Sequence, residues 1–150
     1  MAMKAERLMI NDLVRTNRGE VIKVESISTK RQHRKVGFHR ADDKYHIKYV
    51  RQGQIEPILL TKEILIGLGF TDCGKAGFQR GADTLANKHI SLYLYEGMLI
   101  VGLQRKDEDI SFIHEVFTMH RLQQTLRMCG LDDLANNIII EENGSSKIYV

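Results

Sequence analysis

A change of sequence period at Pro57, the only proline in the chain, most limits how the chain can fold. Before Pro57, runs of β-branched and aromatic residues alternate with turn residues, which is the pattern of short strands. Directly after it, residues 61–69 follow a helical pattern, with Thr61 as a good N-cap and Gly69 as a residue that can end the helix. Because proline cannot donate to a ladder, we expect a strand end and a domain boundary at Pro57.

The first part of the chain predicts a small β unit. Residues 13–27 have the pattern of two strands joined by a tight turn, in which Gly19 tolerates positive φ. Residues 45–50 alternate as a further strand, with Tyr45, Ile47 and Tyr49 on one face. We therefore expect an SH3-like β unit over residues 1–57.

The second part, residues 58–150, predicts an antiparallel sheet with two short helices, packed against the first unit. The expected helices cover residues 61–69 and 118–129, because their apolar residues recur at helical spacing. The glycine-rich residues 71–88 are expected to form a loop. The fold class is thus α+β.

Hairpins are expected at two places in this second part. Residues 89–103 carry Glu96 and Gly97 at the expected turn, and both faces of the hairpin are apolar. The last residues carry Asn143-Gly144 between two β-rich runs, a strong hairpin signal. The last strand can pair within its own chain or across a homodimer, and both alternatives stay open.

Charge is distributed unevenly along the chain. The 150 residues have a net charge of +3, but residues 1–55 carry 13 Lys/Arg and 6 Asp/Glu, whereas residues 56–150 carry 9 and 13. Two interpretations stay open: the two parts face different partners, or they attract each other and pack together.

Residues 29–40 hold the most basic run, which we expect in a hairpin loop between two strands. Five cations could neutralise phosphates, and Phe38 and Tyr45 could stack bases. The candidate nucleic-acid-binding residues are Lys30, Arg31, Arg34, Lys35 and Arg40. The alternatives are a solvated loop and contact with an acidic protein surface, the chain's own acidic part included.

No catalytic or metal-binding pattern is present in the sequence. The six histidines form no zinc motif, and Gly74 to Gly77 resemble a nucleic-acid clamp only in their spacing. Cys73 and Cys129 lack metal spacing and are expected to be free thiols. We expect no cofactor, no metal, no signal peptide and no membrane segment, and therefore a cytoplasmic protein.

Three segments resemble a family of short uncharacterised proteins of gut anaerobic bacteria and their mobile elements. The opening segment matches at Leu8, Ile10, Asp12 and Val14. The central one, residues 55–70, matches the pattern I-E-P-I-x-L-T-x-E-x-L-x-x-x-G-F. The last one resembles V-H-x-L-Q-x-L-x-x-x-x-G, with slightly different spacing between its second leucine and its closing glycine; the matching residues are Met119, His120, Leu122, Gln123, Leu126 and Gly130. The opening segment is also similar to the start of SH3-like or KOW-type barrels.

The resemblance implies no activity and no catalytic residue. Taken together, these patterns predict a non-enzymatic interaction protein with an unidentified protein partner, as an accessory protein of a mobile element. The alternatives are nucleic-acid binding through residues 29–40 and an enzyme whose site is not visible in sequence.

Overall fold

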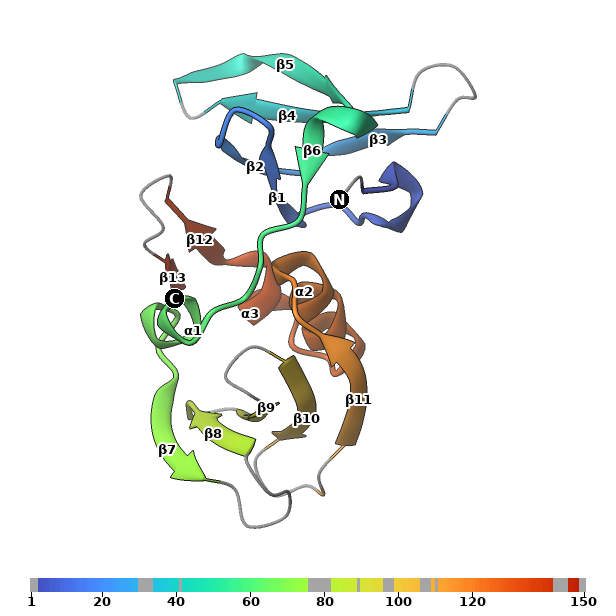
Figure 1. The fold of residues 1–150 in the computed structure, drawn as a ribbon. Helices are drawn as coiled ribbons and strands as arrows, with labels where there is room; N and C mark the ends of the chain where they lie inside the picture. The colour runs from blue at the N-terminus through green and yellow to red at the C-terminus, as the bar shows by residue number, and fades with distance from the viewer. Residues whose placement is uncertain are drawn as a thin grey trace.

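The computed structural model describes residues 3–29, 34–40, 42–75, 82–88, 90–95, 99–105, 109, 111–141 and 146–148. Its architecture is α+β, with several antiparallel sheets and few helices, as predicted (Figure 1). The elements near the N-terminus occupy one end of the view, and the helices and the largest sheet occupy the other.

The N-terminal part holds two three-stranded antiparallel sheets, β2-β1-β6 and β3-β4-β5. Its elements are η1 (Ala5–Arg7), β1 (Leu13–Thr16), β2 (Val21–Lys23), β3 (Ser26–Ser28), β4 (Lys35–Arg40), β5 (Asp43–Arg51), η2 (Gln52–Gln54) and β6 (Ile55–Glu56). The predicted strand pair and the turn at Gly19, with φ of +85°, are confirmed. Among the strands that the structure describes, no closed barrel is found.

The described residues after β6 form a five-stranded antiparallel sheet in the order β11-β10-β9-β8-β7, three helices and a two-stranded sheet, β12-β13. Its elements are α1 (Lys62–Gly67), β7 (Thr71–Lys75), β8 (Ala82–Ala86), β9 (Ile90–Tyr95), β10 (Leu99–Arg105), β11 (Ser111–Val116), α2 (Met119–Met128), α3 (Asp132–Asn136), β12 (Ile138–Ile140) and β13 (Ser146–Ile148). The antiparallel pairs β9–β10 and β12–β13 confirm two of the predicted pairings. The turns predicted at Glu96-Gly97 and Asn143-Gly144 lie outside the described residues.

The two predicted helices are confirmed together with their ends. The Ile64 N–H donates to the Thr61 hydroxyl at 3.2 Å, so Thr61 caps α1. Gly69 and Gly130 follow α1 and α2 with φ of +97° and +76°, the left-handed conformation that ends helices.

Two expectations for loops are wrong. The stretch of residues 71–88, expected as a loop, contains β7 and β8, which pair with each other, and β8 also pairs with β9. Leu85 is fully buried there, so sheet pairing and burial outweigh the local preference of the glycines. Residues 29–40 are also not one loop, because β4 occupies Lys35–Arg40 with Val36 and Phe38 buried.

The hydrophobic core consists of two clusters. One lies among the first six strands and η1, and consists of Met3, Ala5, Leu8, Val14, Ile22, Val24, Val36, Phe38 and Ile55. The other joins the helices to the five-stranded sheet and includes Leu13 from β1. The division into domains of residues 1–57 and 58–150 stays a prediction.

Candidate nucleic-acid interface

Strand β5 is an edge strand with an unusually exposed surface. It pairs with β4 on one side and is the last strand of its sheet. Tyr45, Ile47 and Tyr49 expose 92%, 45% and 53% of their surface. In Figure 1, β5 lies at the end of the molecule farthest from the helices. Exposed apolar side chains that gather on one strand are typical of an interaction surface.

The outer face of this sheet is centred on Gly37. Gly37 pairs with Ser26 on β3 and with Tyr49 on β5, and a Cβ atom at Gly37 would lie 3.0 Å from Tyr49 Cε1 and 3.1 Å from Ile47 Cγ2. The Tyr49 ring and the Ile47 side chain therefore lie over the glycine. This packing fixes both side chains on the outer face, opposite the buried Val36 and Phe38.

Two cations lie on the same face, one on each of its strands. The Lys35 ammonium lies 4.4 Å from the centroid of the Tyr49 ring, a cation–π contact. Arg51 pairs directly with Lys35 across the two strands, so both side chains leave the sheet on one side. Residues 34–51 contain six Lys/Arg and two Asp. We call Lys35, Gly37, Ile47, Tyr49 and Arg51 the outer face.

The five predicted binding residues have different outcomes. Lys35 is part of the outer face, whereas Arg34 lies 3.4 Å from Glu6 and Arg40 lies 3.5 Å from Glu20 in exposed ion pairs. Such pairs contribute little to stability, so both cations can exchange partners at small cost. Lys30 and Arg31 lie outside the described residues.

Two histidines beside this sheet are paired with carboxylates. His39 Nδ1 contacts Glu25 Oε2, and His46 Nδ1 lies 3.0 Å from Asp43 Oδ1. The hydrogen bond with His46 holds the pKa of the Asp43 carboxyl below its ordinary value, assisted by the backbone N–H groups of Tyr45 and His46. Asp43 therefore stays ionised and offsets part of the positive charge at this end of β5.

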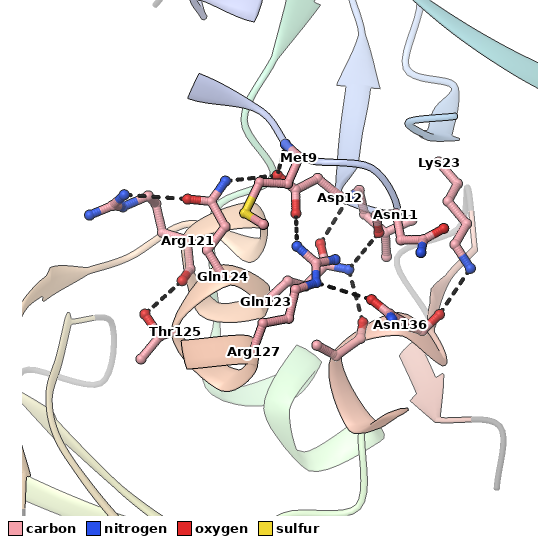
Figure 2. Close-up of polar contacts among 12 residues, drawn as sticks. Met9, Asn11, Asp12, Lys23, Arg121, Gln123, Gln124, Thr125, Arg127 and Asn136 are labelled. Atoms are coloured by element: carbon pink, nitrogen blue, oxygen red, sulfur yellow. Dashed lines mark hydrogen bonds and ion pairs between the residues drawn. The ribbon is translucent and has the colours of Figure 1, made fainter. Parts of the chain in front are cut away.

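A second cluster of polar residues lies where β1 meets α2 (Figure 2). The buried Asp12 carboxylate accepts from Arg127 Nη1 at 2.5 Å, from the Met9 N–H at 2.8 Å and from Gln124 Nε2 at 2.8 Å. Arg127 also donates from Nε to Asn136 at 3.0 Å. Each Asp12 oxygen is engaged inside the chain, so this cluster joins structural elements rather than presenting a carboxylate to a substrate.

Gln123 completes the junction between β1 and the helices. Its Oε1 accepts from the Leu13 N–H at 2.8 Å, and its Nε2 donates to the carbonyl oxygens of Asn11 and Ala135 at 2.9 and 3.0 Å (Figure 2). Asn11 has a φ of +73°, which turns its carbonyl group into this contact. Gln123 is fully buried, and both ends of its amide are satisfied.

His120, on the same helix, is a further buried titratable group, and the Asp12 charge acts on it. Burial lowers the pKa of His120, the Asp12 carboxylate opposes that shift and Arg121 adds to it. Its Nδ1 atom has no hydrogen-bond partner within the described part of the chain. The folded state thus favours neutral His120.

We expect the lowered pKa of His120 to make folding sensitive to acid. An unfolded histidine takes up its proton near pH 6.5, before the folded one does, so the stabilisation is complete above about pH 6.5 and is lost as pH falls through the lower folded pKa. In urea unfolding at pH 7.5 and 5.5, His120→Gln should lose less stability than the wild type between these two values. Equal losses would contradict this assignment.

The part of the chain that the structure describes holds neither a metal site nor a helix that could span a membrane. Among the described residues, no three His, Cys, Asp or Glu side chains are arranged to hold a metal ion. In the same residues, the helices are too short and too polar to cross a bilayer. Cys73 and Cys129 are both free thiols.

Comparison with known proteins finds no matching family model, no similar curated protein and no similar solved structure. The function is therefore argued from the geometry of the outer face and its surroundings.

Proposed function

We propose that this chain is a non-enzymatic binding module that contacts nucleic acid through the sheet β3-β4-β5. The observation that carries the proposal is the outer face, where exposed Ile47 and Tyr49 lie beside Lys35 and Arg51. Lysine and arginine side chains bind phosphates, and aromatic rings offer stacking surfaces for bases.

Charge favours a polyanion over a neutral protein partner. Residues 34–51 carry six Lys/Arg against two Asp, and Lys44, Lys48 and Arg51 are all exposed on one nine-residue strand. A strand that docks onto an apolar protein surface would not need this excess of cations. Lysines also protect an edge strand against unwanted pairing, but that role does not require the exposed tyrosines.

We also propose that the first part of the chain, residues 1–57, is an SH3-like unit. One segment, residues 21–28, contributes β2 to the first sheet and β3 to the second. β2 also contacts β4, and both sheets cover a single apolar cluster. A strand that bends from one sheet into another around a common core is typical of small barrels.

The role of accessory protein of a mobile element, which the family resemblance implies, stays a prediction. So does a homodimer through the last strand, although β13 pairs with β12 inside its own chain. A protein partner is the alternative to nucleic acid, and the binding test distinguishes the two because it measures binding of DNA directly.

The proposal is tested by fluorescence anisotropy with labelled 20-nucleotide DNA, single-stranded and duplex, at several salt concentrations. We expect the affinity to fall as salt rises. In a plot of the logarithm of the binding constant against the logarithm of the salt concentration, each phosphate contact with a single strand should add about 0.7 to the steepness of the slope. The double variant Lys35→Glu with Arg51→Glu should weaken binding at least tenfold and reduce that slope by about 1.4.

A matched variant, Lys88→Glu with Arg121→Glu, makes the same change of net charge at exposed positions outside the sheet β3-β4-β5. We expect it to bind within about threefold of the wild type. The proposal fails if the wild type binds neither DNA at low salt, or if the two double variants weaken binding equally.

A further inference from the structure

We propose that the outer face selects single-stranded nucleic acid by stacking unpaired bases on Tyr49 and Tyr45. This inference rests on the proposed function and deepens it, because it states the class of nucleic acid. Duplex DNA hides the faces of its bases, whereas a single strand can turn them outward onto aromatic rings.

Tyr49 is held in a position suited to stacking. Its ring lies over Gly37, where a side chain would collide with it, and Ser26 and Ile47 are the other close neighbours of that glycine. The ring is thus supported from below by backbone and small side chains, while about half of the residue remains exposed. A ring fixed in this way loses little conformational freedom when a base arrives.

Lys35 occupies part of the Tyr49 ring in the free protein, and magnitudes indicate that a base can replace it. An exposed cation–π contact contributes about 0.5–1 kcal/mol, whereas stacking of one base contributes about 1–3 kcal/mol. The long Lys35 side chain can then swing from the ring to a phosphate. Arg51, its cross-strand neighbour, lies at the same end of the face.

Tyr45 provides a second ring on the same strand. It is the most exposed aromatic residue of those described, and it lies four residues from Tyr49, about 13 Å along an extended strand. Tyr45 lies where the register between β4 and β5 shifts, and the Tyr45 N–H donates to Asp43 Oδ1 at 3.2 Å, which anchors the backbone of this residue. Two exposed rings on one strand can each stack a base of the same single-stranded chain.

The test compares a fluorescein-labelled 12-nucleotide oligothymidylate with a 12-base-pair duplex by anisotropy at one salt concentration. We expect the wild type to bind the single strand at least tenfold more tightly. Tyr45→Ala and Tyr49→Ala should each weaken single-strand binding by about 5-fold or more, the fold-change that corresponds to 1 kcal/mol. Tyr45→Phe and Tyr49→Phe keep the rings and should bind within about twofold of the wild type.

The outcomes separate this inference from the proposed function. Salt-dependent binding of both DNA forms, with equal affinity and no effect of either alanine variant, would overturn the inference and leave the proposed function intact. Absence of binding to either form at low salt would overturn both. Because Tyr45 is almost wholly exposed, its alanine variant should keep the wild-type circular dichroism and unfolding temperature, so its binding result stands even if Tyr49→Ala is unstable.

Discussion

Asp12→Ala is expected to destabilise the protein by about 3–5 kcal/mol, because it leaves a buried arginine without its partner. Asp12 is completely buried, and only 9% of the Arg127 side chain is exposed, with 2.5 Å between Asp12 Oδ1 and Arg127 Nη1. The change also removes the acceptor for the Met9 N–H and for Gln124 Nε2. Since small domains are stable by about 5–15 kcal/mol, this loss is a large fraction of the total.

Urea unfolding followed by circular dichroism measures this effect. The exposed Asp42→Ala serves as the control and should change the free energy of unfolding by less than about 0.5 kcal/mol. Replacing both partners, as in Asp12→Ala with Arg127→Met, should cost less than the sum of the two single changes, because no buried charge is then left alone. A loss below about 1 kcal/mol in Asp12→Ala would show that the ion pair does not hold β1 against α2.

Gln123→Ala is expected to cost about 3 kcal/mol. The substitution leaves the Leu13 N–H and the Ala135 carbonyl oxygen buried without partners, and each unsatisfied buried group costs about 1–3 kcal/mol. Gln123→Glu should be worse still, because a carboxylate oxygen would then face the carbonyl oxygens of Asn11 and Ala135.

Gln124 offers a matched control on the same helix. It donates to the carbonyl oxygen of Arg7 and to Asp12, but it is only partly buried, so water can replace what Gln124→Ala removes. We expect a loss of about 1 kcal/mol for this variant in the same unfolding experiment. If Gln123→Ala and Gln124→Ala were equally stable, the buried amide would not be a main support of the junction.

Features set by neighbouring residues were predictable from the sequence. The Thr61 cap, the glycines after α1 and α2, and the turn at Gly19 follow from local backbone chemistry, and each is present. Thr118 begins α2 as expected, but its hydroxyl does not cap the helix and is buried without a hydrogen-bond partner among the described residues. The Thr118 backbone forms an isolated β-bridge with Leu59.

Features set by distant residues were not predictable. β7 and β8 form although their segment is rich in glycine, because β9 provides a partner for β8 and the apolar cluster of the second part takes in Leu85. Asp12 and Arg127 are 115 residues apart, and no spacing rule links them.

In the candidate site, too, the features set by neighbouring residues were predictable and those set by distant residues were not. Alternation along β5 places Ile47 and Tyr49 on one side, and this was visible in sequence. Whether that side is buried or exposed depends on which layer covers the sheet, and only the fold shows that Val36 and Phe38 on the opposite side face the core. The basic run predicted a binding site at residues 29–40, whereas the tyrosines of the proposed site lie on the following strand, β5.

Mapping of backbone amide chemical shifts on titration with the 12-nucleotide oligothymidylate tests the binding surface most directly. The proposed site predicts that shifts concentrate in Ser26–Ser28, Lys35–Arg40 and Asp43–Arg51, with the largest near Gly37 and Tyr49. Shifts confined to the helices and the five-stranded sheet, or no shifts at low salt, would contradict it.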